Sequence, residues 1–227
     1  MPAGYSALAP DPQIAAIVRR YGDLTATIAD LPIGRIAGPL DRQQTPGGES
    51  TLGALISDAF LAGASRTADG VAPAQIAFTN PGGVRADLSS TLSVSYGKLF
   101  SVMPFNNALV SMDLTGAQLL RLLEQQWEGR ATRSLLLHVS EGFSYSWDAA
   151  RPVGQRVLPG SAMLHGEPIR ADAMYRVATN SFLGEGGDGF TIFKQGKNVQ
   201  TGELDSVVLK LYFRAKGIVQ VLSLIHI

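Results

Sequence analysis

An α+β fold, in which helices pack on a mixed β-sheet, is predicted for this chain of 227 residues. Hydrophobic residues make up 45% of the sequence and charged residues 17%, which is enough apolar material for a sizeable core. Helix-like and strand-like segments are mixed along the chain without the strict alternation of a parallel βαβ fold. The 25 glycines and 12 prolines indicate many turns between these segments.

The first half of the chain is predicted to contain three helices and two strands. Asp11 and Pro12 are typical of a helix start, and the apolar spacing that follows carries this helix to about residue 28. Ser50 caps a second helix with a wide apolar stripe, and a third, short helix over 96–103 ends at Pro104. The strands are expected at 33–37 and 76–79, and the second is closed by a Gly-rich turn.

The second half is predicted to be richer in strands. Thr115 caps a helix on which Leu120, Leu123 and Trp127 share one face. A hairpin is expected around Glu141 and Gly142, and the last helix covers 206–215. The expected strands are 107–114, 135–140, 143–147, 157–164 and 175–180. The apolar tail 221–227 is either a final strand or an artefact of how the chain's end was defined.

Composition excludes several classes of function. Lys and Arg total 19, as do Asp and Glu, so the formal net charge is zero and no nucleic-acid partner is expected. The sequence has no cysteine, which excludes disulfides, thiolate metal ligands and a cysteine nucleophile. No apolar run is long enough to span a bilayer, and residues 1–12 do not have the pattern of a signal peptide.

Residues 184–189 satisfy the spacing G-x-G-x-x-G of dinucleotide-binding loops. Such a loop requires a helix directly after it and an acidic residue about twenty positions further on. Phe190 and the β-branched residues after it argue against a helix start, so we reject this interpretation. A tight loop that approaches a ligand fits better, with Asp188 at its tip. The Asp188 carboxylate accepts hydrogen bonds either from a ligand's hydroxyl pair or from its own turn, and spacing leaves both open.

A second Gly-rich turn, Asn80-Pro81-Gly82-Gly83, precedes Arg85. The guanidinium of Arg85 suits a phosphate or carboxylate, while the alternative is a surface ion pair with Asp87. Two further candidates are aromatic residues that flank these loops, Phe105 after Pro104 and Phe182 before the second loop. Loop aromatics can stack on a base, although ordinary core packing is the commoner role of a single Phe.

A catalytic constellation is missing from the sequence. A dinuclear phosphatase centre needs several His and Asp ligands. The three histidines, His138, His165 and His226, belong to no D-x-H, G-N-H or G-H-x-H pattern, and no G-x-S-x-G elbow is present. We therefore expect neither catalytic residues nor a metal-binding site in this chain.

Four ordered segments resemble the C-terminal domain of bacterial 5'-nucleotidases, a family that includes UDP-sugar hydrolases and 2',3'-cyclic nucleotide phosphodiesterases. The segments are NPGGVR (80–85), VMPFN (102–106), LTGAQLLRLLEQQW (114–127) and YRVATNSFLGEGGDGF (175–190). The resemblance implies a connecting arm and interdomain helix at 1–30, a nucleotide-binding domain at 31–220 and an atypical tail at 221–227. It also implies that an N-terminal metallophosphatase domain with two divalent metal ions, absent here, performs hydrolysis, and that this chain alone is inactive.

The resemblance also implies roles for individual residues. Phe105 and Phe182 would sandwich the base, Asp188 would bind ribose hydroxyls, Asn80 would contact the nucleoside, and Arg85 would reach the phosphate. Four glycines would let the backbone close on the ligand, namely Gly82, Gly83, Gly186 and Gly187. The ligand would be an AMP-like nucleotide, a UDP-sugar or a cyclic nucleotide, and the location periplasmic, cell-surface or secreted.

Two departures from the family bear on the substrate. Some members carry Arg where this chain has Gly48, and many carry Asn where it has Ala54. One phosphate contact would thereby be lost. A stand-alone nucleoside-binding module and a related thiosulfohydrolase remain alternatives, and the sequence does not separate the base preferences.

Overall fold

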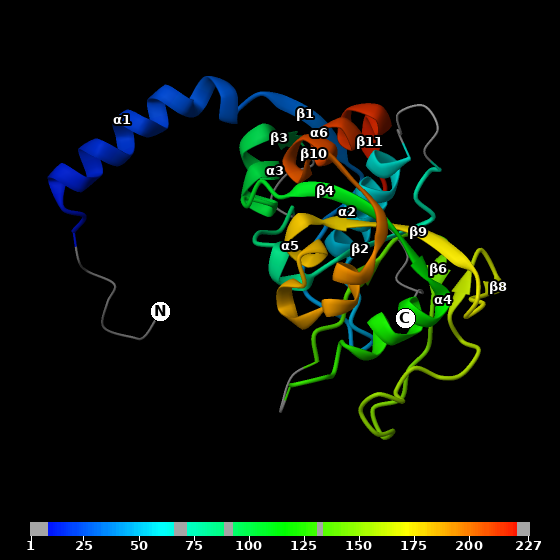
Figure 1. The fold of residues 1–227 in the computed structure, drawn as a ribbon. Helices are drawn as coiled ribbons and strands as arrows, with labels where there is room; N and C mark the ends of the chain where they lie inside the picture. The colour runs from blue at the N-terminus through cyan, green and yellow to red at the C-terminus, as the bar shows by residue number, and fades with distance from the viewer. Residues whose placement is uncertain (1–8, 66–71, 89–92, 131–133, 222–227) are drawn as a thin grey trace.

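Residues 9–65, 72–88, 93–130 and 134–221 are described by a computed structural model of the chain. Its centre is a five-stranded sheet (Figure 1). Strand β9 pairs in parallel with β2, with Ile76 opposite Val177, and the other neighbours pair antiparallel. In spatial order the strands are β10 (Lys197–Leu204), β4 (Ala108–Thr115), β9 (Met174–Asn180), β2 (Ile76–Thr79) and β5 (His138–Val139).

Both faces of this sheet are covered, which gives two hydrophobic cores. Helices α2 (Thr51–Ala64) and α6 (Asp205–Lys216) pack on one face around buried residues such as Phe60 and Phe213. Helix α4 (Gly116–Glu124) and the 3₁₀ helix η3 (Thr191–Gln195) pack on the other face. There Phe78 packs edge-on against Phe143 and Phe193. The predicted α+β fold with a mixed sheet is confirmed.

Two smaller sheets complete the body. One has the order β11 (Ile218–Val219), β1 (Pro32–Ile36) and β3 (Ser93–Ser95), and β3 leads into α3 (Tyr96–Val102). The other has the order β6 (Phe143–Ser144), β7 (Met163–Leu164) and β8 (Glu167–Pro168). The short helical segments are η1 (Pro81–Gly83), α5 (Ser181–Gly184) and η2 (Gly187–Gly189).

The helices begin where the sequence predicts because polar side chains satisfy their first backbone N–H groups. Asp11 accepts hydrogen bonds at the start of α1 (Pro12–Ala29), and Ser50 accepts one from Gly53 in α2. Thr115 and Gln118 form a reciprocal capping box on α4. These starts are set by local sequence and are confirmed.

The predicted hairpin around Glu141 and Gly142 is wrong. Strand β5 pairs with β2 of the central sheet, whereas β6 pairs with β7 of a small sheet. The chain passes between the sheets at this point, because the Glu141 N–H donates to Asp58 at 2.7 Å and Gly142 has φ 87°. Each segment thus finds its partner far away in sequence.

Two further expectations are wrong, and one strand was missed. Only Met163–Leu164 of the predicted strand 157–164 is a strand, while Val157 makes an isolated bridge with Trp147. On α4 the buried leucines are Leu119, Leu122 and Leu123, whereas Leu120 is partly buried. Trp127 is buried but lies beyond the helix end. Strand β10 was not predicted, since all eight of its residues are exposed and it lacks an apolar pattern.

Helix α1 stands away from the body (Figure 1), and none of its residues is buried. Its apolar residues Ile14, Ile17, Tyr21 and Leu24 are more than half exposed. No helix among the described residues is long and apolar enough to cross a membrane. That α1 is an interdomain helix stays a prediction.

Candidate functional site

The predicted site residues gather at one edge of the central sheet. Because β2 and β9 are parallel neighbours, their carboxyl ends meet there. Asn80 directly follows β2, and Asn180 is the last residue of β9. Strand β4 runs antiparallel to β9 and pairs Leu109 with Asn180, so the segment that begins β4, after Phe105, comes to the same edge.

A polar contact joins the two Gly-rich loops. The Asn80 amide donates to Asp188 Oδ2 at 2.7 Å, and the Asn180 amide donates to Asn80 Oδ1 at 3.3 Å. Asp188 has φ 54° and ψ 17°, a left-handed conformation that is uncommon outside glycine. Such backbone strain occurs often at ligand sites, and here it presents the carboxylate beside the Gly82 turn.

Arg130 supports the Asp188 loop and was missed in the sequence. Its guanidinium donates to the Asp188 backbone carbonyl and lies 5.7 Å from the centroid of the Phe190 ring. Its position after the end of α4 carries no recognisable motif, so only the folded chain reveals the contact. Arg130 thereby holds the loop in place from the side of α4.

The two aromatic candidates are surface residues. Phe105 is 53% exposed and Phe182 is 42% exposed, which argues against the alternative of core packing. Within the described part of the chain the two rings make no contact with each other. Each therefore offers an open aromatic face near the Gly-rich loops, as stacking on a flat ligand requires.

Arg85 points toward the aromatic candidate rather than toward Asp87. Its guanidinium carbon lies 5.9 Å from the centroid of Phe105, and it donates to the Gly82 carbonyl at 3.3 Å. The Asp87 carboxylate instead accepts a hydrogen bond from the backbone N–H of Arg42 at 2.8 Å. The alternative of an Arg85–Asp87 pair is therefore not what the structure shows.

A cleft of about 1010 Å³ opens beside Arg85 and Gly82. Arg42, Arg85 and Arg130 line it together with Asp41 and Asp87. The guanidinium groups outnumber the carboxylates in this lining, which favours an anionic ligand group.

Two of the predicted glycines allow close contacts within the site. A Cβ atom on Gly187 would lie 2.6 Å from the Phe182 ring and 2.5 Å from its carbonyl oxygen. A Cβ atom on Gly83 would lie 2.9 Å from Asn80 Oδ1. Gly82 and Gly186 lie in the same two loops. The missing side chains thus let Phe182 and Asn80 take their positions.

The described residues hold no cluster of three or more His, Asp or Glu side chains that could bind a metal ion. His138 is buried in β5 and His165 lies in a turn, while His226 falls outside the described residues. The residues present in this part of the chain therefore do not fit a dinuclear metal centre.

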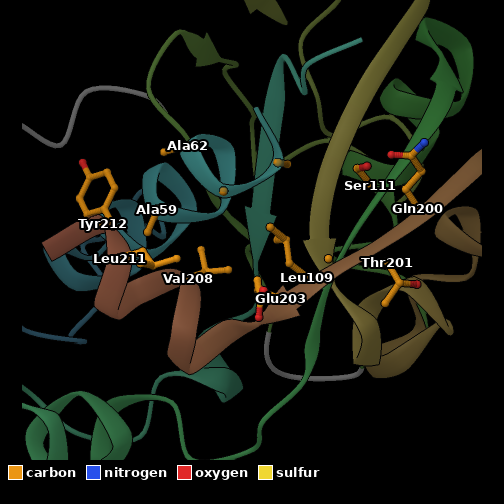
Figure 2. Close-up of a pocket in the computed structure, with 13 residues that line it drawn as sticks. Ala59, Ala62, Leu109, Ser111, Gln200, Thr201, Glu203, Val208, Leu211 and Tyr212 are labelled. Carbon is orange, nitrogen blue, oxygen red and sulfur yellow. The ribbon is translucent and has the colours of Figure 1, made fainter. Parts of the chain in front are cut away.

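A second cavity, of about 420 Å³, lies between α2, α6 and β10 (Figure 2). Small and apolar residues such as Ala59, Gly63 and Val208 form much of its lining, and Tyr212 stands at its rim. The lining includes no guanidinium and none of the predicted site residues. This cavity is therefore separate from the candidate site.

The arrangement of the loops at the carboxyl ends of β2 and β9 is that of a candidate ligand site on an α+β scaffold. Residues 32–195 match the family model described as 5'-nucleotidase, C-terminal domain. The chain belongs to this family and is a substrate-binding C-terminal domain of the 5'-nucleotidase type.

Individual relatives support this assignment. The trifunctional nucleotide phosphoesterase protein YfkN of Bacillus subtilis is 36% identical over 153 residues, which is 66% of this chain and 10% of the relative. The cell wall protein Lmo0130 of Listeria monocytogenes is 31% identical over 172 residues, 73% of this chain and 21% of the relative. The crystal structure of a 5'-nucleotidase precursor from Thermus thermophilus matches with a TM-score of 0.75 and 33% identity, covering 93% of this chain and 42% of that one. The chain therefore spans less than half the length of each of these proteins.

Proposed function

We propose that this chain binds the nucleoside part of a nucleotide for a metal-dependent phosphohydrolase of nucleotide catabolism. Hydrolysis itself is assigned to a metallophosphatase domain outside this chain, which two divalent metal ions would serve. The chain alone would then bind substrate without cleaving it. A surface or exported location is part of the proposal, and the similarity to a cell wall protein supports it.

The observation that carries the proposal is the pair of exposed rings, Phe105 and Phe182. Phe182, in the short helix α5, lies next to Gly187 of the Asp188 loop, and Phe105 lies against Arg85. The exposed ring surface is apolar, so a flat ligand that covers it removes apolar area from water. A base stacked on the rings gains roughly 1–3 kcal/mol per aromatic contact. The Asp188 carboxylate then accepts from the ribose hydroxyls, because a carboxylate only accepts hydrogen bonds.

Arg85 and its cleft supply the third part of the site. The guanidinium lies between the Phe105 ring and the Gly82 turn, so it can remain near the base while it donates to a phosphate. We expect the phosphate that is to be hydrolysed to lie in the arginine-lined cleft. Binding by this chain alone should be weak, with a Kd on the order of 0.1–10 mM.

The test is a calorimetric titration of AMP into the chain in the presence of a chelator, beside a Phe182→Ala variant. Loss of one stacking contact should weaken binding roughly 5- to 150-fold. Tyr21→Ala on the protruding helix α1 is the matched control, since Tyr21 is an exposed aromatic residue outside the site. Its loss should leave the Kd of AMP unchanged.

The outcomes separate the competing functions. Saturable AMP binding that disappears in Phe182→Ala supports nucleoside recognition. Absence of binding for AMP, adenosine and UDP-glucose alike refutes the proposal for this chain and favours a substrate that is not a nucleotide, as in a thiosulfohydrolase. A stand-alone nucleoside-binding module predicts the same binding, but no AMP hydrolysis when the intact natural protein is assayed with divalent metal ions.

A further inference from the structure

A chain of three hydrogen bonds runs through the candidate site from a backbone group to the Asp188 carboxylate. The Leu183 backbone N–H donates to Asn180 Oδ1 at 2.9 Å, and Asn180 Nδ2 donates to Asn80 Oδ1 at 3.3 Å. Asn80 Nδ2 then donates to Asp188 Oδ2 at 2.7 Å. Asn180 stands in the middle of this chain and is fully buried, with 0% exposure.

The direction of these bonds is fixed at both ends. A backbone N–H can only donate and an ionised carboxylate can only accept. Asn180 must therefore turn its oxygen to Leu183 and its amide nitrogen to Asn80. Asn80 must in turn face Asp188 with its nitrogen, so only one orientation of each amide satisfies all three bonds.

We propose that Asn180 is a positioning residue that holds the Asn80 amide in the orientation in which it donates to Asp188 Oδ2. This proposal rests on the proposed function, in which Asp188 binds ribose. With Oδ2 engaged by Asn80, Oδ1 becomes the acceptor for a ribose hydroxyl. Within the described residues Asp188 Oδ1 accepts no hydrogen bond.

Asn180 also links the ribose part of the site to the base part. Its side-chain oxygen caps α5 (Ser181–Gly184), the short helix that carries Phe182. The space beside the Phe182 ring is in turn occupied by Gly187, next to Asp188. One buried amide therefore fixes the base-stacking residue through its oxygen and the ribose carboxylate through its nitrogen.

Two substitutions separate these roles. Asn180→Ser keeps a good helix cap but removes the amide donor to Asn80. Asn180→Ala removes both the cap and the donor. Asn198→Gly on the exposed strand β10 is the matched control, because Asn198 has φ 51° and lies outside the site.

The readout is the ratio of the Kd values for 2',3'-dideoxyadenosine and adenosine, from NMR titrations of the whole chain. The wild type should favour adenosine by roughly ten-fold, as one charge-assisted hydrogen bond provides. Asn180→Ser should lower this ratio to about two-fold or less while dideoxyadenosine binding stays within about two-fold of wild type. Asn180→Ala should weaken both ligands, and Asn198→Gly should change neither.

A second test places Asn180→Ser in an Asn80→Ala background. If Asn180 acts through Asn80, the substitution has no further effect on the ratio there. The proposal is overturned if Asn180→Ser keeps the wild-type ratio of the two Kd values. It is also overturned if Asn180→Ser lowers this ratio as much in the Asn80→Ala background as it does in the wild type. Adenosine binding without any preference over the dideoxy form also overturns it but leaves nucleoside recognition intact, whereas no binding of either nucleoside refutes the proposed function as well.

Discussion

The buried imidazole of His138 should make the fold sensitive to acid. His138 is 1% exposed, and neither of its ring nitrogens has a hydrogen-bond partner within the described residues. The ring lies against α2 so closely that a Cβ atom on Gly53 would be 2.3 Å from it. Burial lowers the pKa of His138 from 6.5 to about 4, and the nearby charge of Glu49 opposes this shift with a smaller effect.

The magnitude follows from proton linkage. A base with a lower pKa in the folded state binds protons more strongly when the chain is unfolded. The free energy of unfolding is therefore highest above pH 6.5, and it falls as the pH decreases from 6.5 toward 4. With these two pKa values, His138 alone should reduce the free energy of unfolding by roughly 2–3 kcal/mol between pH 7.5 and pH 4.5.

The assay is urea unfolding of the wild type and of His138→Phe at both pH values. Phenylalanine keeps a flat ring against Gly53 and removes the titrating nitrogens, which have no partners to lose within the described residues. Any cost of the larger ring is the same at both pH values, so the difference between them is the informative quantity. This difference should shrink by roughly 2–3 kcal/mol in the variant. An unchanged difference would refute the assignment of acid sensitivity to His138.

Three further substitutions test the site and its scaffold. Arg85→Gln should weaken AMP binding about three- to ten-fold and leave adenosine binding unchanged, because the exposed guanidinium contributes through the phosphate. Equal losses of affinity for AMP and adenosine in calorimetry would contradict this. Gly187→Ala should raise the Kd of adenosine, because the new Cβ atom would displace the Phe182 ring. Gly22→Ala is the control, since a Cβ atom there would have no atom within 4 Å; an unchanged Kd of adenosine in Gly187→Ala would contradict the close contact. Thr115→Ala should lower the free energy of unfolding by about 0.5–2 kcal/mol through loss of the capping box, and a wild-type urea midpoint would speak against it.

The sequence predicts those elements whose causes are local. Asp11, Ser50 and Thr115 mark helix starts because each side chain satisfies N–H groups two or three residues away. The segments around Glu141 look like a hairpin for the same local reason, but their true partners lie at 76–79 and 163–164. Strand pairing over such separations depends on which cores form, and no pattern within the segments encodes it.

The candidate site shows the same division. Asn80, Arg85, Phe105, Phe182 and Asp188 lie in or next to turns rich in Gly or Pro, so residue type and position mark them as candidates. Their individual roles come from the family resemblance and stay predictions. The contributions of Asn180 and Arg130 depend on contacts with residues about 100 and 58 positions away, respectively. The one local signal for Asn180 is that it precedes a short helix as an N-cap.

The register between β2 and β9 connects the stability of the fold with the geometry of the site. Ile76 lies opposite Val177 and Ala77 opposite Ala178, which points Phe78 into one core and Ala77 into the other. A slip by one residue would exchange these faces and force the Phe78 ring into the space that Ala77 fills, at the cost of its packing. The same slip would move Asn80 away from Asn180 and break the hydrogen bonds that reach Asp188. The apolar core thus holds the two polar strand ends in the register in which Asn80 and Asn180 form their hydrogen bond.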